Sequence, residues 1–211
     1  MLAKGTPWII FMLPVLVVIL QFPLYVAGYP FAWFTIVQLV VLGSITFLIF
    51  YFFRDPERPT GEGLVAPAHG RVLGVDHEDG RTRLSTFMSP FDVHVIRAPL
   101  DGKVVSMERS GSGFHRASSP DAGHNVQVEI VFDGGDMPFT VVMISGWLAR
   151  RIVPYISEGD AVTRGSRIGL IRFGSRVDVL VPKGAFHFDV EKGSRVRAGS
   201  TSLGVRAHAS G

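Results

Sequence analysis

The longest pattern in this chain is an apolar one: no Asp, Glu, Lys, Arg or His occurs from Gly5 to Phe53. The stretch has 49 residues. As one helix it would extend roughly 74 Å, against about 30 Å for the core of a bilayer. The pattern therefore predicts an N-terminal transmembrane helical hairpin over residues 1–53. Its helices would cover Trp8–Val26 and Phe31–Phe53, joined by a turn at residues 27–30.

Basic residues predict how this hairpin is oriented. Lys4, Arg54 and Arg58 flank its two ends and would lie on one side of the membrane, which the positive-inside tendency makes the cytoplasmic side. A signal peptide is the alternative, with Lys4 as its basic start and an apolar core over Trp8–Leu20, cut near Ala27. In that case a single anchor helix would remain.

Beyond a charged collar at residues 54–59, the pattern changes to short β-branched runs separated by Gly, Pro and Asp. One segment, residues 146–153, could instead form a short helix or turn. Residues 54–211 are therefore predicted to form one mostly β domain. The predicted strands are Arg71–Val75, Asp92–Ile96, Lys103–Met107, Asn125–Phe132, Phe139–Ile144, Ser166–Ile171 and Arg176–Val181.

Two internal repeats narrow the architecture. The pattern Ala-Pro-x-x-Gly-x-Val starts at Ala66 and again at Ala98, and Gly-x-x-Val-x-x-Gly-Ser starts at Gly159 and again at Gly193. Paired hairpins of this kind predict a flattened barrel-sandwich with pseudo-two-fold character, like that of lipoyl and biotinyl carrier domains.

Composition excludes several kinds of chemistry. The chain has no cysteine, so disulfides, thiolate nucleophiles and cysteine zinc sites are absent. Its seven histidines show no close-spaced ligand pair, so no metal site is predicted. Charge is nearly balanced, at +3 over the whole chain, and no nucleic-acid partner is expected. Arginine makes up 17 of the 21 basic residues, and its planar fork suits phosphate or carboxylate groups.

Five motifs in order resemble the short-form, membrane-anchored phosphatidylserine decarboxylase proenzymes. The most specific is the last, Ile168-Gly-Leu-Ile-Arg-Phe-Gly-Ser-Arg-Val-Asp178. The other four are Phe52-Phe-Arg-Asp-Pro-Glu-Arg58, Ala66-Pro67, Met88-Ser-Pro-Phe-Asp-Val-His-Val-Ile-Arg-Ala-Pro99 and Gly146-Trp-Leu-Ala-Arg-Arg-Ile152.

The resemblance implies that the chain cuts itself between Gly174 and Ser175, one of six Gly-Ser pairs in the sequence. Ser175 would attack the Gly174 carbonyl, and elimination and hydrolysis would leave a covalent pyruvoyl group as the cofactor. Two chains, 1–174 and 175–211, would then form a heterodimer. Ser200 is an alternative cleavage point, but cutting there would leave only 12 residues.

The same resemblance assigns catalytic roles to histidines. His94 matches the family's histidine motif and would deliver a proton after carbon dioxide leaves. His69 stands where relatives usually carry Asp, and Arg97 stands where the long branch has a second histidine. The base that activates Ser175 therefore stays open: His69 could serve, Asp92 or Asp101 could orient a histidine, or self-cleavage could be slow or lost.

The substrate implied by the resemblance is a membrane phospholipid, phosphatidylserine, which would be converted to phosphatidylethanolamine at a bacterial inner membrane. Arg150 and Arg151 are candidates for binding its phosphate, and Asn125 for lining the pocket. Two alternatives stay open. The enzyme could decarboxylate another serine phospholipid, or the domain could be a non-catalytic membrane adaptor.

Overall fold

The computed structural model describes residues 2–4, 6, 12–28, 32–113, 115–146, 151–172 and 175–207. The chain divides into two compact units, residues 1–54 and 55–211. The helices are α1 Met12–Val26 and α2 Ala32–Phe52, and a short 3-10 helix covers Pro120–His124. The strands are β1 Leu64–Val65, β2 Gly70–Glu78, β3 Arg81–Met88, β4 Val95–Arg97, β5 Gly102–Ser110, β6 Gln127–Asp133, β7 Pro138–Ile144, β8 Ile152–Pro154, β9 Ala161–Val162, β10 Arg167–Ile171, β11 Ser175–Pro182, β12 Phe186–Phe188, β13 Arg195–Val196 and β14 Ser202–Arg206.

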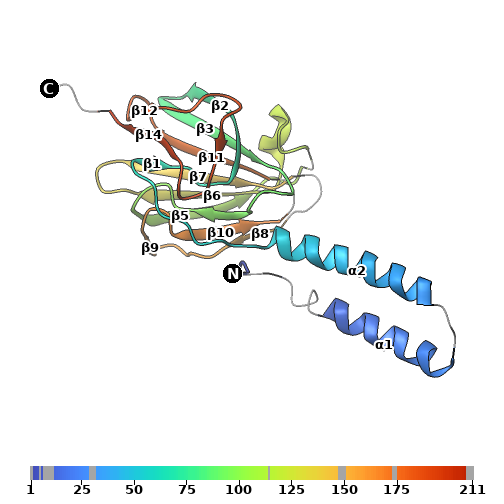
Figure 1. Ribbon diagram of the computed structural model, residues 1–211. Coiled ribbons are helices and arrows are strands. Elements are labelled where there is room, and N and C mark those ends of the chain that lie inside the picture. Colours follow the sequence, from blue (N-terminus) through green and yellow to red (C-terminus); the bar gives the residue numbers. More distant parts are fainter. Residues whose placement is uncertain are drawn as a thin grey trace. The chain divides into compact units, whose positions relative to one another are not determined.

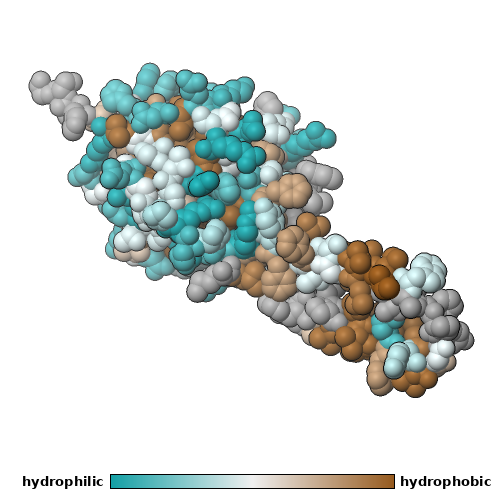
Figure 2. All heavy atoms as spheres, in the orientation of Figure 1, coloured by the Kyte–Doolittle hydropathy of each residue, from teal (hydrophilic) through white to brown (hydrophobic). Residues whose placement is uncertain are grey.

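The first unit is a pair of apolar helices. α1 and α2 contact each other, as the apolar pattern predicts, and Gly28 after α1 adopts a φ of 72°, which glycine accommodates in a turn. Large apolar side chains on both helices are exposed, and this unit is mainly brown in Figure 2. The predicted membrane crossing is not supported, because none of the helices in the described residues is long and apolar enough to span a bilayer.

The second unit is mostly β, as predicted. Its largest sheet has eight strands in the order β13-β2-β3-β11-β7-β6-β5-β9, and two three-stranded sheets, β1-β14-β12 and β4-β10-β8, complete it (Figure 1). The large sheet curls into a half-barrel and does not form the flattened barrel-sandwich that we expected. Its edge strands, β13 and β9, have two residues each and do not pair with one another, so the sheet stays open.

Seven strands overlap predicted runs, and the other seven were not predicted: β1, β3, β8, β9, β12, β13 and β14. β3 carries Arg81, Arg83 and two threonines among its eight residues, so its alternation was too polar to predict a strand. In the segment 146–153, which was expected to form a short helix or turn, Ile152 begins β8.

The two sequence repeats correspond to equivalent edges of the large sheet. At one edge Val196 pairs with Gly70, and at the other Val162 pairs with Gly102. Each following hairpin contains a bulge at the same place: Val72 pairs with Thr86 before one, and Val104 pairs with Phe132 before the other. The sheet therefore has an internal pseudo-two-fold between β11 and β7, which makes its two ends equivalent in backbone.

The core of this unit lies on one face of the large sheet. Alternate residues of the central strands supply it, because successive side chains of a strand point to opposite faces. β11 contributes Val177, Val179 and Val181, while β7 contributes Phe139, Val141 and Met143. We call this the core face. Ser175 and Ser145 follow the same alternation and therefore belong to it.

Candidate active site

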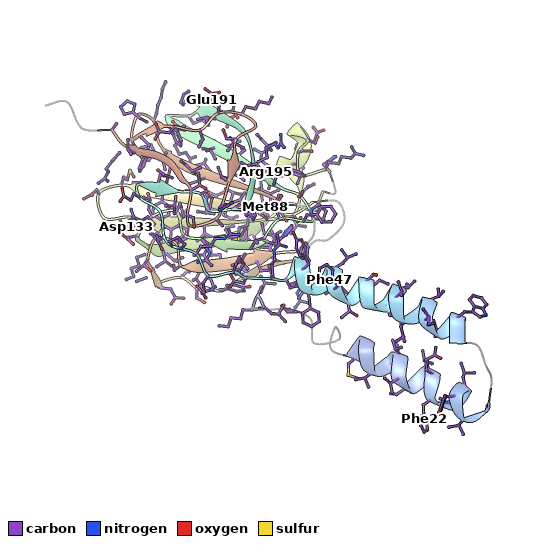
Figure 3. All side chains as sticks on the ribbon, in the orientation of Figure 1. Phe22, Phe47, Met88, Asp133, Glu191 and Arg195 are labelled. Atoms are coloured by element: carbon purple, nitrogen blue, oxygen red, sulfur yellow. The ribbon has the colours of Figure 1, made fainter. Side chains whose placement is uncertain are left out.

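Ser175 is the first residue of β11 and is fully buried. It pairs with Met88, the last residue of β3, which is labelled in Figure 3. Its hydroxyl has no hydrogen-bond partner in the described residues. A buried hydroxyl without a partner costs about 1–3 kcal/mol, so its presence at this point needs a chemical reason. Gly174, the other residue of the predicted cleavage site, lies outside the described residues.

The segments that carry the predicted histidines meet near Met88. A side chain in place of Gly70 would lie 2.0 Å from the Phe87 carbonyl oxygen and 3.3 Å from the Met88 Cα, so glycine permits β2 to approach here. Ser89 then donates two hydrogen bonds to the Asp92 carboxylate, from its backbone nitrogen at 2.8 Å and its Oγ at 2.7 Å. The residues directly before Gly70 therefore lie close to the loop that follows Met88.

His69 lies beside Asp92 in this place. Its Nδ1 accepts hydrogen bonds from the Val93 backbone nitrogen at 3.3 Å and from the Arg58 guanidinium at 3.4 Å. The ring proton is therefore assigned to Nε2, which lies 3.8 Å from Asp92 Oδ1. A general base needs a lone pair aimed at its substrate, and the Nδ1 lone pair faces Val93 and Arg58. This geometry favours a role for His69 in holding the loop, so its assignment as the base stays a prediction.

His94 lies directly before β4 and is fully buried. Its Nδ1 lies 2.8 Å from the backbone carbonyl oxygen of Asp92. Because a carbonyl oxygen only accepts, neutral His94 carries its proton on Nδ1 and presents Nε2 as an acceptor. The carbonyl of His94 in turn accepts a hydrogen bond from Ile171 at 3.3 Å, which ties the histidine to the strand leading toward Ser175.

Arg97 occupies a structural position and not the site of a second histidine. Its guanidinium donates to the Gly165 carbonyl at 2.9 Å, to Asp55 at 3.2 Å and to the Pro56 carbonyl at 3.2 Å. Asp55 also binds Arg167, whose pKa is raised mainly by hydrogen bonds to Glu57 and Asp55. The charged collar after α2 is thus an ion network that fixes the start of the β unit.

Asn125 is fully buried, and its amide is used by backbone groups. It accepts from the His115 nitrogen at 2.7 Å and donates to the carbonyls of His115 at 2.7 Å and Ser145 at 2.8 Å. Both amide protons are therefore taken. Asn125 holds the loop before β6 and the end of β7, which favours a positioning role over the predicted substrate contact.

Of the two arginines predicted to bind phosphate, Arg150 lies outside the described residues and Arg151 is exposed. A third arginine, Arg172, which the sequence did not single out, lies beside Arg151. Extending the pairing of Ile171 with Ile152 places Arg172 opposite Arg151, and the Arg172 nitrogen donates to the Arg151 carbonyl at 3.1 Å. Burial, followed by repulsion from Arg151, lowers the pKa of Arg172.

The remaining candidates have structural roles. Ser200 is not fully buried, and its Oγ donates to the Pro59 carbonyl at 2.7 Å. Asp101 accepts from the Arg164 backbone nitrogen at 2.7 Å, as a turn residue would. The described residues include no group of three side chains that could hold a metal ion. A cavity of about 260 Å³ lies by the β6–β7 turn, at the opposite end of those strands from Ser145.

Comparison with known proteins gives consistent results. The family model for phosphatidylserine decarboxylase matches residues 45–204. The chain is 46% identical over 155 residues to a phosphatidylserine decarboxylase proenzyme of Streptomyces avermitilis, covering 72% of each chain. It is 49% identical over 155 residues to a provisionally named archaetidylserine decarboxylase proenzyme of Archaeoglobus fulgidus, covering 72% of this chain and 74% of that one. A similarly named protein of Methanopyrus kandleri is 42% identical over 190 residues, covering 82% and 88%.

Proposed function

Because the chain belongs to the phosphatidylserine decarboxylase family and is an enzyme of that family, we propose that it cuts itself between Gly174 and Ser175 and then converts phosphatidylserine to phosphatidylethanolamine and carbon dioxide. The observation that carries the proposal is the buried hydroxyl of Ser175, which has no partner in the described residues. A second serine phospholipid is also a candidate substrate, because two relatives of similar identity have archaetidylserine in their names.

Self-cleavage would begin with attack by Ser175. Its Oγ bonds to the carbonyl carbon of Gly174, the bond from that carbon to the Ser175 nitrogen breaks, and the hydroxyl proton ends on this nitrogen. The resulting ester then loses the Ser175 Cα proton and the Gly174 carboxylate. Water hydrolyses the remaining dehydroalanine with release of ammonia and leaves a pyruvoyl group on Arg176.

We assign the proton transfers to His94. Its Nδ1 proton is fixed on the Asp92 carbonyl, so Nε2 is the nitrogen that can take a proton and return it. The ring is fully buried, and its backbone is tied to β10 through Ile171. A histidine held in this tautomer suits both tasks that the reaction sets: accepting a proton during self-cleavage and delivering one after carbon dioxide leaves.

The residues around position 175 fit a pyruvoyl group. The position is buried, its partner on β3 is the apolar Met88, and the hydroxyl that would be lost in making the group has no hydrogen-bond partner among the described residues. When present, the group supplies an electrophilic carbonyl that withdraws electrons from the substrate as carbon dioxide departs. The chain's own residues then bind the substrate, exclude water and move the proton at His94 Nε2.

Substrate phosphate would bind between Arg151 and Arg172. Like charges directly opposite each other on antiparallel strands repel, and here one of the pair is also partly buried. An anion between the two guanidinium groups would relieve this repulsion, and arginine matches the oxygens of a phosphodiester well. Arg172 lies three residues before Ser175, so a phosphate bound there would bring the serine headgroup close to the reacting position.

The two chains produced by cleavage would stay together as a heterodimer. β11 belongs to the smaller chain, 175–211, yet it pairs on one side with β3 and on the other with β7. β14 and β13 of the same piece pair with β1 and β2. Strands of the smaller chain therefore pair with strands of the larger chain in two sheets, and the smaller chain would not dissociate unless the β unit unfolded.

We further propose that the helical unit keeps the enzyme at its lipid substrate. Its exposed side chains are mainly large and apolar, including Leu16, Ile19, Phe22, Val40 and Phe47. Such a surface favours contact with lipid over water. A location at the bacterial inner membrane, with the β unit on the cytoplasmic face, stays a prediction from the basic residues that flank the helices.

Intact-mass analysis of the purified chain tests self-cleavage. We expect two chains divided after Gly174, the smaller carrying an N-terminal pyruvoyl group. Ser175→Ala should stay whole at 23.1 kDa and lose all activity, whereas Ser200→Ala should be cut normally. A single uncut wild-type chain would contradict the proposal. Decarboxylation of vesicles containing either diacyl phosphatidylserine or its ether analogue then identifies the preferred lipid.

A further inference from the structure

Two hydroxyls besides that of Ser175 are buried at the same end of the large sheet without a partner in the described residues. They belong to Ser145 and Thr86, and both residues are fully buried. Each buried polar group without a hydrogen bond costs about 1–3 kcal/mol, so three in one place are unfavourable for packing alone. Such a cluster is typical of a site where polar chemistry occurs.

The ladder of β11 and β7, extended by one pair, places Ser145 across from Ser175. Arg176 pairs with Ile144 in the antiparallel ladder of β11 and β7, so the next pair outward joins Ser175 with Ser145. Opposite residues of such a pair point to the same face, with Cβ atoms about 4.5–5.5 Å apart. Both serines belong to the core face, where Met143 and Val177 form the preceding row. The extended register therefore places the two side chains next to each other on this face, with no hydrogen bond between them in the described residues.

The backbone of Ser145 is held on both sides, whereas its side chain is not. Its nitrogen donates to the Val126 carbonyl at 2.9 Å, and its carbonyl accepts from the Asn125 amide at 2.8 Å. These bonds fix the backbone of Ser145, and Oγ stays available to a group at position 175. Asn125 thereby acts on the site through Ser145.

The fold itself does not require a serine at this position. At the other end of the sheet the pseudo-two-fold equivalent of Ser145 is Lys183, whose nitrogen donates to the Gly80 carbonyl at 2.9 Å in the same way. Lys183 is exposed and has no hydroxyl. The hydroxyl of Ser145 is thus specific to the end that carries Ser175.

We propose that Ser145 is a positioning residue for self-cleavage: its hydroxyl donates a hydrogen bond to Ser175 Oγ and so holds that oxygen toward the Gly174 carbonyl, while the Ser175 proton is left to His94. This inference rests on the proposed function. Ser145 gains and loses no proton overall, since the Ser175 proton still ends on the Ser175 nitrogen. Misplacing a nucleophile by about 1 Å costs on the order of 100-fold in rate, which sets the scale of the effect.

The test follows cleavage over time in the full chain, made by cell-free synthesis and sampled by intact mass. Ser145→Ala should slow release of chain 175–211 by about 10- to 100-fold. Ser145→Thr keeps the hydroxyl and should remain within about threefold of wild type. Thr140→Val is the matched control, because Thr140 is buried on the same strand but points to the other face.

Two results would overturn this role. In one, Ser145→Ala is cut at the wild-type rate. In the other, Ser145→Ala and Ser145→Thr are slowed equally and both unfold at lower temperature, which would mean that the serine only supports packing. A wild-type chain that is never cut would instead overturn the proposed function, and the inference with it.

Discussion

The two ends of the large sheet share a backbone but not a chemistry. Through the pseudo-two-fold, Thr86 and Val177 at the Ser175 end correspond to Phe132 and Phe139 at the other end. Phe132 and Phe139 stack with ring centroids 4.7 Å apart and fill their end of the core. The same row at the Ser175 end carries two much smaller side chains, one of them with a hydroxyl. The pseudo-two-fold thus relates two equivalent positions, one filled by aromatic packing and one with small side chains and a hydroxyl.

Neighbouring rows follow the same division. Met88 and Ser175 correspond to Gly134 and Met137, which belong to the tight turn between β6 and β7. His69 corresponds to Asp101, whose carboxylate caps a turn. At one end β6 and β7 are joined by a short turn, whereas at the other end β3 and β11 are not joined to each other and lead into separate connections. The candidate site therefore lies at the end of the sheet where no short turn joins the paired strands β3 and β11.

The largest expected effect is on stability, from removing part of the Phe132–Phe139 stack. Phe132→Ala removes one ring of the stack and should lower the free energy of unfolding by about 3–5 kcal/mol. Denaturant unfolding in the Ser175→Ala background, where the chain stays whole, measures it. Self-cleavage of Phe132→Ala alone should be normal while the protein is folded. Impaired cleavage in a folded sample would show that the two ends are coupled.

The sequence predicts the elements better than it predicts the site. The two apolar helices, the mostly β unit and the hairpin repeats follow from local patterns and from glycines that recur with fixed neighbours. Ser175 and His94 are found because their motifs resemble a family. Ser145, Thr86 and Arg172 are not, because each acquires meaning from a residue opposite it on another strand. That register depends on how distant segments pair, and only the structure supplies it.

The outer face of β11 gives the second test. Arg176 makes two hydrogen bonds to Asp178, at 2.6 and 2.8 Å, and one to Ser85 at 2.9 Å, whereas the equivalent positions at the other end are Pro138, Thr140 and Val131. Asp178→Asn should lower the free energy of unfolding by about 2–3 kcal/mol, because it leaves Arg176 without its counter-charge.

Asp136→Asn is the control for this change. Asp136 pairs with Arg206 at 2.7 Å, but both side chains are exposed, so the variant should lose no more than about 1 kcal/mol. Equal losses in the two variants would contradict the view that the Arg176 pair anchors the strand that begins with Ser175.

The smallest effect is expected at Thr86, which marks the border between the polar site and the apolar core. Thr86→Val keeps the shape of the side chain and removes a buried hydroxyl that has no partner in the described residues, so the free energy of unfolding should rise by about 1 kcal/mol. Cleavage should change by less than about threefold, because Thr86 lies one row inward from Ser175. Thermal unfolding in the Ser175→Ala background measures the first, and the cleavage time course measures the second. A loss of stability would mean that the Thr86 hydroxyl makes a hydrogen bond in the folded protein. Thr86 would then not belong to the polar site, which would be limited to the row of Ser175, Ser145 and Met88.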